Sequence, residues 1–101
     1  EALIDLGYLH QQARDPEMAL KYYVQALDYN DSATLYRDIG LLKHKQKHED
    51  APVYLQQALQ RLPDMKKVYK KLLPYLSEEE REIWSAHAKR FGVTIPGVSP
   101  L

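Results

Sequence analysis

The chain has 101 residues, of which 45% are apolar and 28% charged, and its 14 basic and 14 acidic side chains cancel at pH 7. This length and composition are typical of a single globular domain with a thin core, and not of a disordered or fibrous protein. Cysteine is absent, which excludes disulfides, thiolate metal sites and cysteine nucleophiles, and no apolar run reaches the roughly 18 residues of a membrane-spanning helix.

Apolar residues recur at helical spacing from the first residues onward, and no segment alternates as a strand would. The spacing predicts a helix over residues 2–13 and a second over residues 16–29. Asp15 is suited to cap the second helix, and Pro16 fits its first turn, where a missing N–H has no effect.

The middle of the chain continues in the same way. We expect a third helix over residues 33–47 and a fourth that ends near Leu62. Asp50 or a neighbour would cap the fourth helix, because Pro52 is tolerated only in the first turn of a helix. The turn between these helices is therefore confined to the segment HKQKHED.

Two further helices are expected towards the end of the chain. A fifth covers roughly residues 65–73. Ser77 and Glu80 form a capping box for a sixth, which ends near Phe91 with Gly92 as its C-cap. An extended, proline-broken tail follows.

An internal repeat explains two glycines inside helical segments. Gly7 recurs as Gly40, an offset of 33 in the numbering, and the set Ala19, Tyr23 and Ala26 recurs at an offset of 32 as Ala51, Leu55 and Ala58. Glycine costs about 1 kcal/mol relative to alanine inside a helix. Close approach of another helix must offset that cost. The change from 33 to 32 predicts that one residue is missing from the second internal turn.

The repeat resembles the tetratricopeptide repeat family, whose 34-residue pattern is W-x2-L-G-x2-Y, then A-x3-F, a second Ala and a Pro. In the first copy Leu6, Gly7, Ala19 and Ala26 match, while Leu3, His10, Tyr23 and Asp31 stand at the Trp, Tyr, Phe and Pro positions. In the second copy Gly40, Ala51, Ala58 and Pro63 match, while Tyr36, Lys43 and Leu55 stand at the Trp, Tyr and Phe positions.

The resemblance implies an all-α fold, a right-handed α-α superhelix built as a solenoid of helical hairpins, with six antiparallel helices. Residues 1–31 form one repeat, 33–63 a second, 65–91 a degenerate repeat with a capping helix, and 92–101 the tail. Leu73 takes the glycine place in the third copy. On the last helix, the end of the array would be covered by Ile83, Trp84, Ala88 and Phe91, with Glu78 to Glu82 and Arg90 facing solvent. Because Glu1 already lies within a first helix, we expect the chain to be part of a longer array.

The residues that carry chemistry give no sign of an enzyme. His44 and His48 have the spacing of a two-histidine metal site without a third ligand, so we expect solvent-facing histidines. His10 lies on the apolar stripe, as a hydrogen-bonded core histidine would. The segment SEEERE is accounted for by helix capping. We therefore expect no catalytic residues, no cofactor, no metal and no small-molecule substrate.

Function is then expected from shape, because the first helix of each pair lines a concave groove in this family. By register with the two glycines the lining residues are Ile4, Tyr8, Gln11, Gln12, Arg37, Leu41, His44, Lys45, Lys67 and Lys70. Residues 34–71 contain nine basic and four acidic side chains, so the partner is expected to be a protein or peptide, acidic in character. Nucleic acid is disfavoured, since Tyr69 is the one aromatic residue among the lysines of this cluster.

Two alternatives stay open at this level. The same residues could be an ordinary exposed helix face, and the chain could act as a spacer or self-association segment of a longer solenoid. Some relatives bind chaperone carboxyl termini, but at their clamp positions this chain has Ile4, Tyr8, Asp38, Lys67 and Lys71. Asp38 would repel a carboxylate there, which disfavours that ligand. The sequence does not identify the compartment, because cytosol and periplasm are both compatible.

Overall fold

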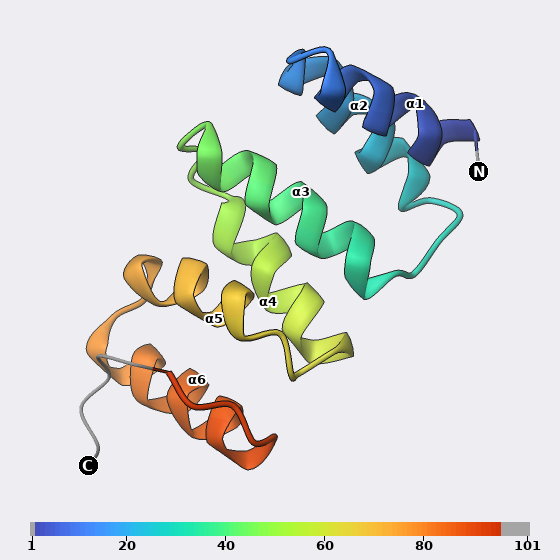
Figure 1. Cartoon of the computed structure of the whole chain (residues 1–101). Helices are drawn as coiled ribbons and strands as arrows, with labels where there is room; N and C mark the ends of the chain where they lie inside the picture. Colours follow the sequence, from blue (N-terminus) through green and yellow to red (C-terminus); the bar gives the residue numbers. More distant parts are fainter. Residues whose placement is uncertain (1, 96–101) are drawn as a thin grey trace.

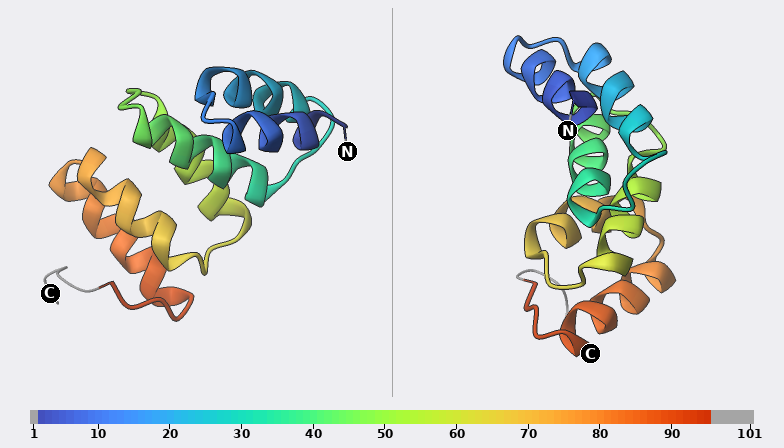
Figure 2. Two further views of the ribbon diagram at one scale, coloured as in Figure 1. Left: turned by 45° about the horizontal axis from the view of Figure 1, so that its top comes forward. Right: turned by 90° about the vertical axis from the view of Figure 1, so that its right-hand side faces the viewer.

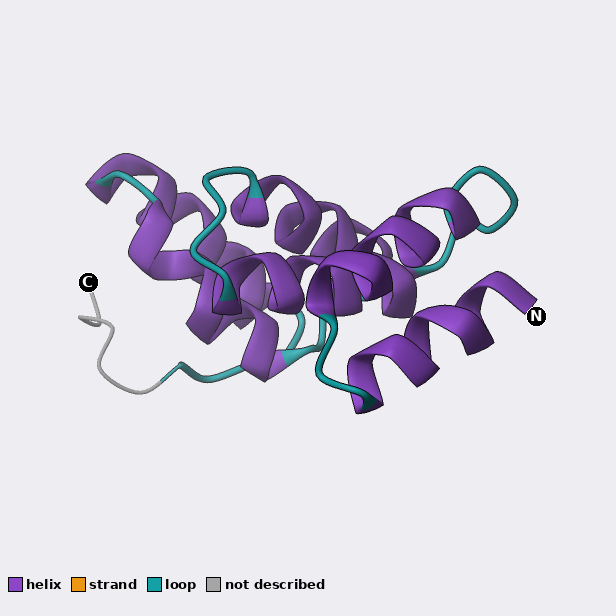
Figure 3. Ribbon diagram, turned by 90° about the horizontal axis from the view of Figure 1, so that it is seen from above, coloured by secondary structure: helices purple, strands orange, loops and turns teal. Residues whose placement is uncertain are grey.

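The computed structural model describes residues 2–95 of the chain. Over that range it contains six α-helices, one 3-10 helix and no strand, which confirms the all-helical prediction (Figure 1, Figure 3). The helices are α1 (Ala2–Gln12), α2 (Pro16–Ala26), α3 (Ala33–Lys45), α4 (Ala51–Arg61), α5 (Lys66–Leu72) and α6 (Glu78–Arg90), and the 3-10 helix η1 (Leu73–Tyr75) follows α5 directly.

Two predicted helix starts have the expected caps. Asp15 is the residue before Pro16, the first residue of α2. Its carboxylate accepts a hydrogen bond from the Met18 backbone N–H at 3.4 Å. The Ser77 hydroxyl accepts from the Glu80 N–H at 3.3 Å, and the Glu80 carboxylate accepts from the Ser77 N–H at 3.0 Å. These three N–H donors would otherwise be unpaired at a helix N-terminus.

Asp50 lies at the predicted position before α4, but the prediction that its side chain caps the helix is wrong. The side chain makes no capping bond. Its carboxylate instead accepts from the Lys43 Nζ at 2.9 Å, and this bond lowers the pKa of Asp50 below its usual value. The lysine on α3 competes with the helix N-terminus for the same carboxylate, which periodicity cannot reveal.

The two internal turns start alike and end differently. Arg14 and Lys47, which are separated by the same offset as the two glycines, both have a left-handed backbone with φ near +60°. The connection from α1 to α2 has three residues, whereas the connection from α3 to α4 has five, so the second turn is longer than the first and not shorter as predicted. Pro52 explains the difference because it has to lie in the first turn of α4. The second copy therefore lacks the first helical turn that α2 possesses.

The glycines lie where the helices of each pair approach most closely. A Cβ atom on Gly7 would lie 2.7 Å from two ring carbons of Tyr23, and one on Gly40 would lie 2.7 Å from the Leu55 Cδ2. Real Cβ contacts are not that short, so only glycine fits between these helices. Tertiary packing thus offsets the low helix propensity of glycine at both positions.

Each helix packs on its neighbour in the chain, and α3 also contacts α5. The molecule is elongated, measuring 45 × 23 × 19 Å, with α1 at one end and α6 at the other (Figure 1, Figure 2). One core cluster joins α2 and α3 through Ala19, Leu20, Tyr23, Ala26, Leu35, Ile39 and Leu42. A second joins α4, α5, η1 and α6 through Leu55, Leu59, Val68, Tyr69, Leu72, Leu73, Leu76 and Ala88.

An ion pair and an aromatic contact join the end of α4 to α3 and to the connection that precedes it. Arg61, the last residue of α4, donates from Nε to the Asp31 carboxylate at 2.6 Å. Its guanidinium lies 4.3 Å from the centre of the Tyr36 ring on α3. The connection between α2 and α3 is thereby held against the end of α4, through a contact that combines charge with ring packing.

The last helix covers the array with fewer residues than predicted. Ala88 is buried and Trp84 half-buried against the second cluster, but Ile83 and Phe91 are exposed. Ile83 lies about 100° round the helix from Trp84, so both cannot face α5. The glutamates of the segment SEEERE and Arg90 are exposed as expected.

The hydroxyl of Tyr69, in the second cluster, takes part in two hydrogen bonds, one with Pro63 and one with His87 on α6. The Tyr69 hydroxyl donates to the Pro63 carbonyl at 2.6 Å, so the contact of 2.8 Å to His87 requires Nδ1–H to donate to that hydroxyl. Burial, and secondarily the charge of Arg90, lower the pKa of His87 below its usual value of 6.5. Protonation of His87 is therefore linked to the docking of α6.

We expect Gly7→Leu to lower the free energy of unfolding by about 1–3 kcal/mol, because the new side chain overpacks against Tyr23. Urea unfolding curves would measure the change, and Ala13→Leu, at an exposed position just after α1, serves as the control. Equal stability of the two variants would contradict the close contact.

We also expect the free energy of unfolding to fall as the pH drops below about 6.5. The unfolded chain binds the His87 proton more readily than the folded chain, so stability is lost down to the lowered folded pKa of His87. Urea unfolding between about pH 5 and 7.5 measures this slope. The His87→Gln variant should have a shallower slope, and an unchanged slope would refute the role of His87.

Candidate binding groove

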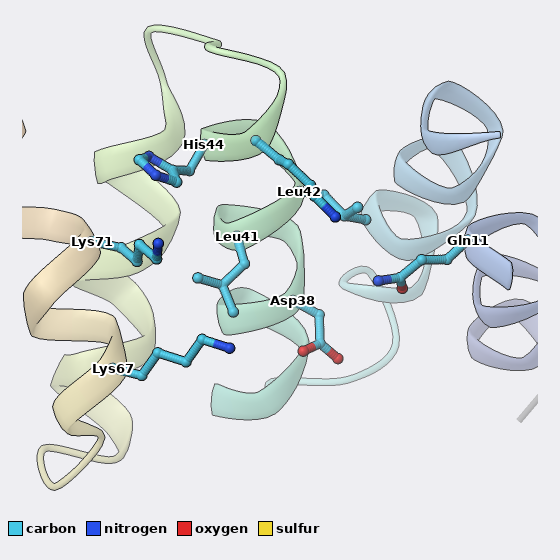
Figure 4. Close-up of a pocket in the computed structure, with 8 residues that line it drawn as sticks. Gln11, Asp38, Leu41, Leu42, His44, Lys67 and Lys71 are labelled. Carbon is cyan, nitrogen blue, oxygen red and sulfur yellow. The ribbon is translucent and has the colours of Figure 1, made fainter. Parts of the chain in front are cut away.

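A groove lies between the first helices of successive pairs. It has a volume of about 300 Å³ and is lined by Gln11 from α1, by Lys67 and Lys71 from α5, and on α3 by Asp38, Leu41, Leu42, His44 and Lys45. We name it the α3/α5 groove. Figure 4 shows Lys67 and Lys71 extending from α5 towards Leu41 and Asp38. The helical spacing of Asp38, Leu41 and Lys45 directs these side chains to one face of α3.

A second depression, which we name the turn hollow, adjoins the groove. It has a volume of about 700 Å³, and its lining residues are His44, Lys45, Lys47, His48, Glu49, Lys71 and Tyr75. His44, Lys45 and Lys71 line both spaces. The two depressions therefore form a continuous basic surface along α3 and α5, with few acidic side chains in it.

The groove brings together five of the ten residues predicted from the repeat register. These are Gln11, Leu41, His44, Lys45 and Lys67. The other five line neither depression. Ile4 is half-buried against the first cluster, Arg37 is half-buried beside Asp38, and Tyr8, Gln12 and Lys70 are exposed elsewhere.

Three lining residues were absent from the predicted set, namely Asp38, Leu42 and Lys71. Lys71 follows Lys70 in the sequence, but on a helix the two side chains point about 100° apart. The repeat register therefore predicted the correct helix, α5, but named Lys70 where Lys71 lines the groove. A pattern of contacts between α3 and α5 would have been needed to choose between them.

Lys71 differs in its surroundings from every comparable charged side chain. Within residues 2–95, six Asp, Glu, Lys or Arg residues are half-buried, and five of them have a hydrogen-bonded or ionic partner: Asp15, Arg37, Asp38, Lys43 and Arg61. Lys71 has none there, and neither does Lys67 on the same helix or Lys45 on α3. Partly buried charges are normally paired. The groove thus presents cations that nothing in the described part of the chain neutralises.

Hydrogen bonds fix two polar side chains at the groove. The Tyr23 hydroxyl donates to the Gln11 Oε1 at 2.8 Å, and Figure 4 shows the Gln11 amide nitrogen directed towards α3. Burial, and then the charge of Asp38, raise the pKa of Tyr23, so its hydroxyl keeps its proton as the donor. At the other side, the His44 Nδ1 lies 2.7 Å from the Tyr75 hydroxyl. These two contacts therefore fix Gln11 and His44 in the walls of the groove.

The histidines have local partners. His48 is exposed and contacts the Gln46 amide oxygen at 3.0 Å, while His44 contacts Tyr75. His10 is not a core histidine as expected: it is half-buried and stacks on Tyr22 at 5.3 Å, at the edge of the first pair. Residues 2–95 contain no group of three potential metal ligands, and no helix among them has the length and apolar character needed to cross a membrane.

In comparisons with known proteins, no protein-family model matches the chain, and a search of curated proteins finds no significant match.

The half-buried charge of Lys71, which has no partner in the described part of the chain, leads to a test of stability. We expect Lys71→Met to raise the free energy of unfolding by about 0.5–1 kcal/mol, because it keeps the aliphatic stem and removes a charge repelled by its lysine neighbours. Lys43→Met is the matched control and should lower it, because Asp50 loses its partner. Thermal unfolding measures both, and a loss of stability in Lys71→Met would show that the lysine is satisfied.

Proposed function

We propose that this protein is a helical-repeat binding module of the tetratricopeptide kind, which holds an acidic segment of a partner protein in the α3/α5 groove. The observation that carries this proposal is the set of cations around Leu41 that have no partner within residues 2–95: Lys45, Lys67 and the half-buried Lys71. If these lysines served only to stabilise the fold, pairing them with carboxylates of the same chain would increase the free energy of unfolding. An acidic ligand would supply the missing partners.

The internal repetition supports the tetratricopeptide interpretation. A Cβ atom added at Gly7 or at Gly40 would lie at the same distance, 2.7 Å, from a bulky side chain of the following helix, and Arg14 and Lys47 adopt the same left-handed backbone. Both pairs are related by the same offset in the sequence. A right-handed superhelical stacking of the pairs, with the first helices on the concave side, is the arrangement we propose for them.

The groove suggests what the ligand looks like. Leu41 is half-buried at its centre and can receive an apolar side chain of the partner, while the lysines around it can receive carboxylates. Asp38 is already paired with Arg37 at 3.2 Å, so its charge is offset in part. An extended peptide or one face of a helix with alternating acidic and apolar residues would satisfy both parts of the groove.

The experiment uses a short fluorescein-labelled peptide of alternating Glu and Leu, and a matched peptide with Lys in place of each Glu. We expect fluorescence polarisation to show binding of the acidic peptide only, weaker at higher ionic strength. Lys71→Met should reduce the affinity by about threefold to tenfold, and Lys67→Glu should mainly slow association.

The control variant is Lys21→Met, which removes an exposed lysine on α2 and should leave binding unchanged. Equal effects of Lys21→Met and Lys71→Met would mean that net charge alone attracts the peptide. A polyuridylate RNA that binds more tightly than the acidic peptide, with the same loss in Lys71→Met, would replace the proposal by nucleic-acid binding.

A further inference from the structure

The turn hollow gathers positive charge that no described residue neutralises. Lys45, Lys47 and Lys71 line it, and Glu49 is the one acidic side chain among its described lining residues. None of the three lysines has a side-chain hydrogen bond or an ionic partner within residues 2–95. Like charges held close together repel each other, so an anion bound among them would be stabilised.

Helix ends account for part of this charge but not for all of it. Lys45 and Lys71 lie in the last turns of α3 and α5, where the exposed carbonyl groups favour cations. Lys47 and His48 lie beyond the end of α3, in the connection to α4. Lys47 therefore contributes to the charge of the hollow without stabilising a helix end.

Hydrogen-bond donors lie beside the lysines. The His44 Nδ1 is 2.7 Å from the Tyr75 hydroxyl, and both side chains line the hollow. When that hydroxyl donates to Nδ1, the ring proton lies on Nε2, which can then donate to a ligand. Figure 4 shows His44 and Lys71 on the same side of Leu41. The hollow can therefore surround an anion with ammonium groups and an imidazole N–H.

An anion with several oxygens fits this arrangement better than a single carboxylate does. A carboxylate carries one negative charge, whereas a phosphate monoester at pH 7 carries about 1.5 to 2 and has three acceptor oxygens. Several lysines can donate to those oxygens at once, through charge-assisted hydrogen bonds. The hollow, at about 700 Å³, is also larger than the α3/α5 groove, at about 300 Å³.

We propose that the turn hollow binds a phosphorylated serine or threonine side chain of the acidic segment that occupies the α3/α5 groove. This inference rests on the proposed function, because it adds a subsite for the same ligand. His44, Lys45 and Lys71 line both spaces, so one extended peptide can place carboxylates in the groove and a phosphate in the hollow. Phosphorylation of the partner would then strengthen its binding.

The test compares three fluorescein-labelled peptides of alternating Glu and Leu that differ at one terminal residue, which is serine, glutamate or phosphoserine. Two sets place this residue at either end, because both orientations of the peptide are allowed for. We expect fluorescence polarisation to show that phosphoserine at one of the ends strengthens binding at least about tenfold over serine, and that glutamate there changes it less than about threefold. Phosphoserine peptides that bind no tighter than the glutamate peptides, in both sets, would overturn the inference.

Two exposed lysines separate the hollow from the groove. Lys47 lines the hollow alone, and Lys67 lines the groove alone. Lys47→Met should weaken binding of the phosphoserine peptide about threefold to tenfold and leave the serine peptide unchanged, whereas Lys67→Met should weaken both. An equal loss for both peptides in Lys47→Met would overturn the assignment of the phosphate to the hollow. Thermal unfolding checks that both variants stay folded.

The same titrations distinguish this inference from the proposed function. Binding of the serine and glutamate peptides, with no gain from phosphoserine, would keep the proposed function and overturn the phosphate subsite. Binding of the phosphoserine peptide alone, lost in Lys47→Met and unaffected by Lys67→Met, would keep the phosphate site and overturn the groove. Failure of all the peptides to bind would overturn both.

Competition identifies the source of the phosphate. Inorganic phosphate lacks the segment that fills the groove, so it should displace the phosphoserine peptide far less effectively than the unlabelled peptide does. Equal displacement by inorganic phosphate would indicate a site for the free anion and overturn the inference. A polyuridylate RNA that displaces the peptide more effectively than the unlabelled peptide does would assign the hollow to nucleic acid and also overturn it.

Discussion

The close approach of two helices at a glycine is the contact from which the rest of this structure follows. At Gly7 and Gly40 the backbone of the first helix meets Tyr23 and Leu55 of the second with no room for a methyl group. That distance fixes which side of each first helix is turned inward, and therefore which sides remain for other purposes. A larger residue in place of the glycine would force the facing side chain or the helices themselves to shift.

Three sides of α3 each have a distinct packing role. Gly40 packs on α4, the row of Leu35, Ile39 and Leu42 packs under α2, and the side that bears Leu41 and Lys45 forms the wall of the α3/α5 groove. α1 has the same division but lacks a helix over its row within the described part of the chain. One packing rule thus explains a buried core, a polar groove and an exposed apolar stripe.

The sequence predicts the local features of this fold well, because they depend on residues close together. The caps at Asp15 and Ser77 and the six helices follow from spacing alone. Features that depend on distant partners do not follow. Asp50 pairs with Lys43 instead of capping α4, and the groove selects Lys71 over its neighbour Lys70. A rotation of about 100° separates adjacent helical residues, so a register that is correct for backbones can still name the wrong side chain.

The distribution of charge along the α3/α5 groove would favour an acidic ligand and would also favour one orientation of that ligand. The first pair of helices is acidic, whereas Lys45, Lys67 and Lys71 lie at the α3 and α5 side of the groove. An acidic segment would be attracted to the second side and repelled from the first, where Gln11 offers an uncharged amide held by Tyr23. The carboxylates of such a segment would therefore lie over α3 and α5, and any uncharged residues at one of its ends would lie towards α1. Asp38, paired with Arg37 between these two regions, strengthens this order because an unpaired carboxylate of the ligand would avoid it.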